Sequence, residues 1–121
     1  MSNKKVLVCL VSNGVSDHLQ ASRQRKATTI LKARKLPYVE VDGMNPDHKE
    51  SREELFAISG IRGNYPQFFF VHANGATSYL GNFEKLEELN ETVDIPDDVL
   101  NANPDLETWP RVFKDVVESF Q

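Results

Sequence analysis

The sequence holds few residues whose type and spacing could support catalysis. Cys9 is the only cysteine among its 121 residues, so it has no Cys-x-x-Cys pair for thiol-disulfide exchange. The thiol stands within the apolar run Val6 to Val11, away from any helix terminus or cationic neighbour that would lower its pKa. We therefore interpret Cys9 as a small buried apolar residue, and an oxidoreductase working through it is the least favoured function.

The three histidines do not form the pattern of a metal site. His18, His48 and His72 stand far apart in the sequence, without partners at the spacing that a zinc site requires. We therefore expect no metal to be bound.

A polar loop, Ser12 to Asp17, follows the apolar run and leads into a helix predicted from about His18 to Lys35. Ser16 or Asp17 can cap this helix. Arg23 falls on its apolar stripe, and we expect the guanidinium to lie beside the loop, where the helix N-terminus also favours an anion. The candidate ligand-binding residues of this segment are Ser12, Asn13, Ser16 and Arg23.

The elements around these residues alternate between strands and helices. Val6 to Val11 is apolar on both faces, which predicts a central strand. Pro37 ends the first helix, and Tyr38 to Asp42 predicts a second strand, parallel to the first because the helix between them is a crossover. A second helix is expected to end near Ile58, before Gly60. Its start is marked by a cap, a proline and an early acid at Asn45, Pro46 and Asp47.

Two further strands are predicted to form a hairpin. Gln67 to His72 is strongly β-prone, and Thr77 to Leu80 follows it after Asn74 and Gly75. An Asn-Gly pair suits the positive φ angles of a tight type I′ turn. A third helix follows the hairpin, with Asn82 as its expected cap.

Residues 91 to 121 differ from the rest of the chain in charge. They hold eight acidic residues and two basic ones, Arg111 and Lys114, which gives this segment a net charge of −6. The whole chain has a net charge of −4, so the rest of it carries +2. A turn-rich connector is expected first, then a last helix from about Thr108 or Pro110. Its apolar stripe should pack on the body. The alternative is a partner surface formed by Trp109, Phe113 and Phe120.

Half of the basic residues of the body lie in the first helix, between Arg23 and Lys35. A solvated helix face is the favoured interpretation, and docking of the acidic C-terminal segment on it is the alternative. Nucleic-acid binding is not expected, because the chain is acidic and lacks aromatic residues among the basic ones. No apolar run reaches the ~18 residues of a membrane span, and the start is too short for a secretory leader. We therefore expect a cytoplasmic protein that does not enter a membrane.

The order β, α, β, α, β, β, α resembles the thioredoxin layout. The chain looks like the glutaredoxin branch of that fold, and more closely like the SH3-domain-binding glutamic-acid-rich-protein-like family, over about Lys5 to Glu91. The motifs that carry this resemblance are the loop Ser12 to Ser16 in place of a thiol motif, Tyr65-Pro66-Gln67, and Tyr79-Leu80-Gly81-Asn82. It implies a three-layer α/β/α sandwich with a four-stranded mixed sheet and an extra C-terminal helix. We expect a glutaredoxin-like domain at 1–90 and an acidic connector with a packed helix at 91–121.

In glutaredoxins the loop after the first strand carries the nucleophilic cysteine, whereas this loop has none, and a serine hydroxyl without a neighbouring base cannot replace it. The resemblance implies that a cis proline, here Pro66, and the preceding Tyr65 offer backbone hydrogen bonds to a peptide such as glutathione. Gly81 and Asn82 would then bind its carboxylate. SH3 binding is not expected, because no second proline stands at PxxP spacing from Pro66.

Three functions are compatible with these residues. The favoured one is a redox-inactive, non-enzymatic adaptor module that binds protein partners, as a monomer or weak dimer. The alternative is a protein that binds glutathione or another peptide in the groove that the resemblance places beside Tyr65 and Pro66. We expect no cofactor, and glutathione is considered only as a ligand. Glutaredoxin-type oxidoreduction is the third.

Overall fold

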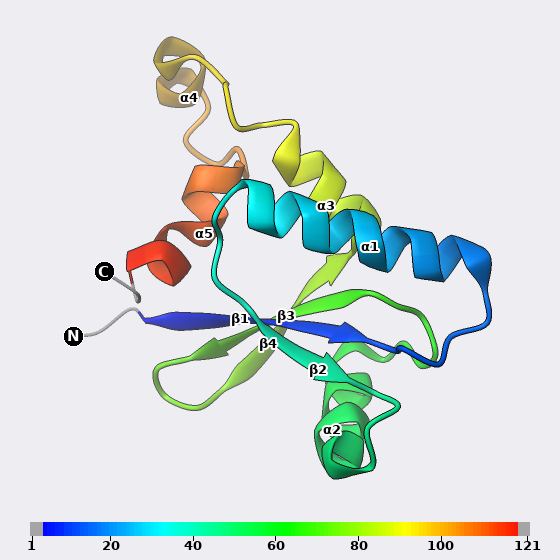
Figure 1. Ribbon diagram of the computed structural model, residues 1–121. Coiled ribbons are helices and arrows are strands. Elements are labelled where there is room, and N and C mark those ends of the chain that lie inside the picture. Colours follow the sequence, from blue (N-terminus) through cyan, green and yellow to red (C-terminus); the bar gives the residue numbers. More distant parts are fainter. Residues whose placement is uncertain (1–3, 119–121) are drawn as a thin grey trace.

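The computed structural model describes residues 4–118, and it is built around one mixed sheet of four strands (Figure 1). The strand order is β2-β1-β3-β4, with β1 parallel to β2 and antiparallel to β3, and β3 antiparallel to β4. This arrangement confirms both the parallel crossover and the hairpin. The strands are β1 (Lys5–Val11), β2 (Val39–Asp42), β3 (Gln67–His72) and β4 (Thr77–Asn82).

Helices cover both faces of the sheet, and α1 and α3 lie on the face opposite to α2 (Figure 1). The fold is thus the expected thioredoxin-like α/β sandwich with an added C-terminal helix. The helices are α1 (His18–Ala33), the 3-10 turn η1 (Pro46–His48), α2 (Lys49–Ser59), α3 (Phe83–Asn90), α4 (Asp97–Ala102) and α5 (Trp109–Glu118). Within residues 4–118, none of them is both long enough and apolar enough to pass through a bilayer.

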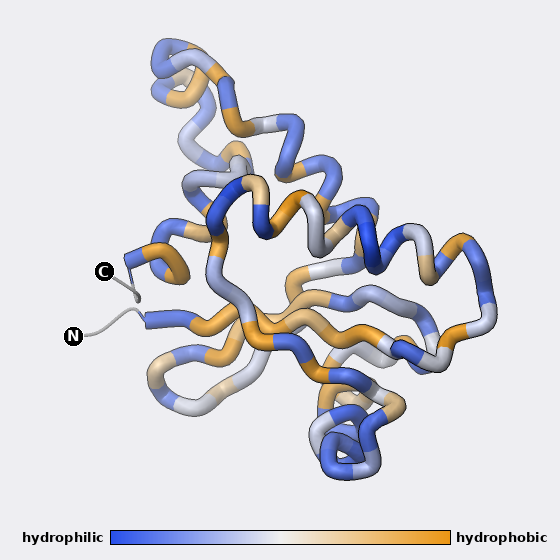
Figure 2. Tube along the Cα trace, viewed as in Figure 1, coloured by the Kyte–Doolittle hydropathy of each residue, from blue (hydrophilic) through white to orange (hydrophobic). Residues whose placement is uncertain are grey.

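Strand β1 separates two apolar clusters, as its uninterrupted hydrophobic sequence predicts. Figure 2 shows this strand coloured orange along most of its length. Leu7 and Cys9 point into the cluster beneath α1, α3 and α5, and Val8 and Leu10 point into the cluster beneath α2. Alternate residues of a strand face opposite sides of a sheet, so a central strand must be apolar at every position.

Helix α5 packs its apolar stripe against the sheet. Trp109, Phe113 and Val116 are all buried, and the Phe113 ring lies 4.6 Å from that of Trp109 and 5.9 Å from that of Phe70 on β3, between centroids. Packing on the body is therefore confirmed, and the alternative that Trp109 and Phe113 form an exposed partner surface is wrong. Phe120 lies outside the described residues.

The hairpin is confirmed, but its predicted type I′ turn is wrong. Gly75 has a positive φ of 87° whereas Asn74 does not, and a type I′ turn needs positive φ at both. The His72 N–H donates to the Ala76 oxygen at 2.8 Å, which closes a three-residue loop, and Asn74 Oδ1 accepts from the Ala76 N–H. Asn74 therefore acts through its side chain.

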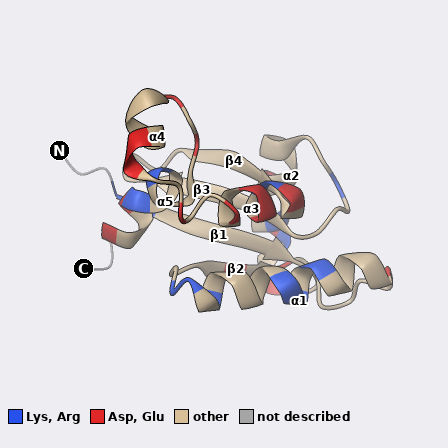
Figure 3. Cartoon of the chain, turned by 90° about the horizontal axis from the view of Figure 1, so that it is seen from above, with Lys and Arg blue, Asp and Glu red and all other residues tan. Residues whose placement is uncertain are grey.

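The acidic connector, which was expected to consist of turns, contains the short helix α4. Arg111 on α5 holds the connector by donating to the carbonyl oxygens of Leu100, Asn103 and Leu106 at 2.8–2.9 Å. No ion pair among residues 4–118 joins this segment to α1, and the acidic residues of α4 lie apart from α1 (Figure 3). The solvated-face interpretation of α1 thus agrees with the structure, and docking of the acidic segment on it is wrong.

Candidate functional site

The Tyr65–Pro66 peptide bond is cis, as the resemblance implies, and Pro66 is fully buried. The Tyr65 N–H, which the resemblance assigns to a bound peptide, donates instead to Gln20 Oε1 on α1 at 2.9 Å. The Tyr65 ring is half-buried 6.1 Å from Phe56, between centroids, and burial raises the pKa of its hydroxyl. The side chain of Gln20 therefore already occupies the position that the resemblance assigns to a bound peptide.

Gly81 and Asn82 form the end of β4 and the start of α3. Asn82 Oδ1 accepts from the Lys85 N–H at 3.1 Å, so Asn82 is a helix cap, as predicted. Gly81 is buried, and a Cβ placed on it would lie 2.5 Å from Cβ of Lys85. This approach requires glycine, so both residues have a structural use that does not need a bound carboxylate.

The loop Ser12 to Asp17 is tied to the surrounding elements by hydrogen bonds. Ser12 is buried, and Gln24 on α1 bonds both of its backbone groups: the Ser12 N–H donates to Oε1 at 2.6 Å, and Nε2 donates to the Ser12 oxygen at 3.1 Å. Asp17, not Ser16, caps α1 by accepting from the Leu19 and Gln20 N–H groups. The hydrogen bond from Gln20 and that from Leu19 hold the pKa of the Asp17 carboxyl below its ordinary value.

Asn13 is fixed to the end of β2. Its backbone N–H and its Nδ2 donate to the two carboxylate oxygens of Asp42, at 3.1 and 2.7 Å. Burial would raise the pKa of Asp42, but the hydrogen bonds from Met44 and Asn13 outweigh it and the pKa is lowered. The carboxylate therefore stays charged and keeps this edge of the sheet closed around the loop.

Arg23 does not lie beside the loop as expected. Its Nη2 is 3.8 Å from Glu84 Oε1, and its guanidinium lies 5.9 Å from the centre of the Phe83 ring. Both partners are on α3. Arg23 therefore lies on the side of α1 that faces α3, and not on the side that faces the loop. The ligand role predicted for Arg23 through the loop is thus not supported by its position.

A cluster of three charged residues lies near Tyr65. Glu53 accepts from both terminal nitrogens of Arg62, at 2.6 and 3.0 Å, and from Arg52 at 2.9 Å. Hydrogen bonds from Arg62 and then Arg52 lower the pKa of Glu53 to about 2. Arg52 also donates to the Gly43 oxygen at 3.0 Å, so this cluster braces the turn after β2.

Cys9 is buried in the sheet beneath α1, as predicted. Burial, with a smaller contribution from the charge of Glu40, raises the pKa of the thiol to about 12. Residues 4–118 include no cluster of three or more histidine, cysteine or acidic side chains that could hold a metal ion.

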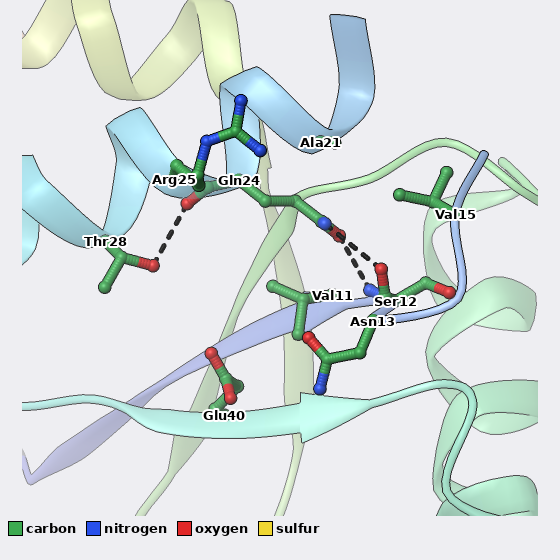
Figure 4. A pocket seen from close by; sticks show the side chains of 9 residues that line it. All are labelled: Val11, Ser12, Asn13, Val15, Ala21, Gln24, Arg25, Thr28 and Glu40. Atoms are coloured by element: carbon green, nitrogen blue, oxygen red, sulfur yellow. Dashed lines mark hydrogen bonds between the residues drawn. The ribbon is translucent and has the colours of Figure 1, made fainter. Parts of the chain in front are cut away.

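A polar groove opens between α1 and β2, next to the loop that follows β1 (Figure 4). Strand β2 lies on the opposite side of β1 from β3. Its volume is about 240 Å³, and Arg25 on α1 and Glu40 on β2 carry the charged groups that face it. Of the residues predicted for a site, only Ser12 and Asn13 line it. The complete lining is Val11, Ser12, Asn13, Val15, Ala21, Gln24, Arg25, Thr28 and Glu40.

Sequence reasoning missed Gln24, Arg25, Thr28 and Glu40. The spacing of Ala21, Arg25 and Thr28 places them on one side of a helix, which is a usable signal. That this side faces β2 follows only from the packing of α1 on the sheet.

No family model matches the chain, and no curated protein matches it. Among solved structures, actin interacting protein 5 (Aip5, wild type) is similar, with a TM-score of 0.52 and 22% identity. The match covers 75% of this chain and 88% of that one. At this identity the likeness shows the fold alone.

Proposed function

We propose that this protein is a redox-inactive interaction module on a thioredoxin-like fold. The observation that carries the proposal is the use of the loop after β1. Instead of a sulfur nucleophile at the start of α1, the loop presents backbone groups that Gln24 binds at 2.6 and 3.1 Å. A loop used in this way positions α1 and offers no group for thiol exchange.

The state of Cys9 supports the same proposal. A thiol with a pKa of about 12 is protonated at neutral pH, and only the thiolate attacks a disulfide. Its place inside the sheet also denies a disulfide access to the sulfur.

The similar solved structure supports protein binding as a use of this fold, since that protein is named for an interaction with actin. That interaction belongs to the neighbour, and its transfer to this chain is not part of the proposal. Membership of the SH3-domain-binding glutamic-acid-rich-protein-like family likewise stays a prediction based on the sequence motifs.

The alternative function, binding of glutathione or a similar peptide at Tyr65, requires a specific rearrangement. Gln20 must release the Tyr65 N–H, at the cost of about 1 kcal/mol for an exchanged hydrogen bond. A Gln20→Ala variant frees this donor. If the alternative is correct, glutathione will shift the amide signals around Tyr65 in the wild type, and more strongly in Gln20→Ala.

The proposal is tested by glutathione-dependent disulfide reduction. We expect no turnover with the wild type, and no change in Cys9→Ser. Turnover that disappears in Cys9→Ser would refute redox inactivity. Thiol labelling under native conditions provides a matched control: Ser16→Cys places a thiol at an exposed position near the start of α1, and it should be alkylated rapidly while wild-type Cys9 reacts only after denaturation.

A further inference from the structure

We propose that α1 and the adjoining groove bind an extended acidic segment of a partner protein. This inference rests on the proposed interaction function and names its partner chemistry. Helix α1 has no acidic residue between His18 and Ala33. Its exposed basic stripe is defined as Arg25, Lys26 and Lys32. Figure 3 shows several blue segments along α1.

The cations of the basic stripe differ from their neighbours in having no partner within the described chain. Arg23 is paired with Glu84, and Arg34 donates to Asn90 Oδ1 at 2.8 Å, so both are engaged on the α3 side. No ion pair or side-chain hydrogen bond within residues 4–118 engages Arg25, Lys26 or Lys32. Arg25 and Lys32 lie two turns apart on one side of α1, and Lys26 lies about 100° around the helix from Arg25. Three unpaired like charges on one helix repel each other, and an acidic ligand relieves that repulsion.

The groove gives such a ligand a defined path. Arg25 stands on its α1 side and Glu40 on its β2 side, with Thr28 farther along the helix (Figure 4). Strand β2 is the edge of the sheet, and Val39 and Glu40 on it are exposed. An edge strand can pair with an added extended chain, and the side chains of that chain would then reach the basic stripe.

The surface fits an acidic polypeptide better than a nucleic acid. The chain carries a net charge of −4, and Glu40 would face a phosphate backbone. The exposed large apolar residues of the described chain include no aromatic ring on which a base could stack.

Glu40 adds a condition on the partner. Its carboxylate repels acids placed over β2 and tolerates them over α1, so the acidic side chains must point to the helix. A Glu40→Gln variant should therefore bind an acidic peptide more tightly than the wild type does.

The test measures fluorescence anisotropy of a labelled synthetic peptide rich in Asp and Glu, with a lysine-rich peptide of the same length as comparison. We expect the wild type to bind the acidic peptide and not the basic one, with an affinity that falls as salt is added. Arg25→Glu/Lys26→Glu should weaken binding about tenfold. The matched control, Lys49→Glu/Lys114→Glu, makes the same change in net charge at exposed positions on α2 and α5 and should have little effect.

Three results would overturn the inference: no binding of the acidic peptide, equal weakening by the control pair, or equally tight binding of a single-stranded oligonucleotide. Chemical-shift mapping must also place the bound peptide on α1 and β2. These results are distinct from failure of the proposed function, which is observed as Cys9-dependent turnover in the absence of any peptide.

Discussion

Helices α5 and α1 each carry a stripe at helical spacing, and the fold treats the two stripes in opposite ways. The stripe of α5 is apolar, with Trp109, Phe113 and Val116 buried against the sheet, whereas Arg25, Lys26 and Lys32 on α1 remain exposed. The sequence offered the stripe of α5 as a possible partner surface and the cations of α1 as a solvated helix face. The difference teaches that the apolar stripe stabilises the protein, whereas the charged stripe stays exposed and is available for the recognition role that we propose.

The largest effect is expected from Phe113→Ala. Phe113 is 1% exposed and contacts both Trp109 and Phe70, so truncation leaves a cavity in the core beneath α5. The free energy of unfolding should fall by about 3 to 5 kcal/mol. Urea denaturation followed by circular dichroism measures it.

Val117→Ala is the matched control on the same helix, because Val117 is 40% exposed. Its effect should stay within about 0.5 kcal/mol. If the two variants had similar small effects, α5 would not be part of the core, and the contrast with α1 would fail.

Much of the fold could be predicted because it depends on local patterns. The doubly apolar β1, the cap at Asn82 and the Gly60 terminus of α2 each follow from a few adjacent residues. Helix α4 was missed because Pro96 and two aspartates are typical of turns as well as of a helix start.

The candidate site was harder to predict because its contacts join distant residues. Gln20 reaches Tyr65 across 45 positions, and Gln24 reaches Ser12 across 12. A glutamine in a helix gives no sign of which backbone group it will bind. Arg23 and Arg25 are only two residues apart, yet about 200° of helical rotation sends one to α3 and the other to the groove.

A second, smaller effect tests whether Gln24, which lines the groove, stabilises the fold. Gln24→Ala removes both hydrogen bonds to the backbone of buried Ser12, and the free energy of unfolding should fall by about 2 kcal/mol. Exposed Lys26→Ala on the same helix is the control and should change stability little. A loss as small as that of the control would mean that water replaces Gln24 at no cost.

The ion pairs of Glu53 on α2 with Arg52 and Arg62 give a smaller, pH-dependent effect. The pKa of Glu53 is lowered from an ordinary 4.5 to about 2, so its stabilising contribution is present above pH 4.5 and is lost as the pH falls toward about 2. The difference in stability between the wild type and Glu53→Gln should therefore shrink over that range, which denaturation at several pH values measures. A difference independent of pH would show that the pairing with Arg62 is absent in solution.

The smallest expected effect completes the comparison. Because Arg25 and Lys26 have no ion-pair partner in the described chain, Arg25→Glu/Lys26→Glu should change the free energy of unfolding by no more than about 0.5 kcal/mol. The measurement is the same urea titration used for Phe113→Ala. If this charge reversal leaves the free energy of unfolding unchanged and yet weakens binding of an acidic peptide, the basic stripe acts in recognition. A loss of stability comparable to that of Gln24→Ala would instead assign these cations to the fold, and the distinction between α1 and α5 would disappear.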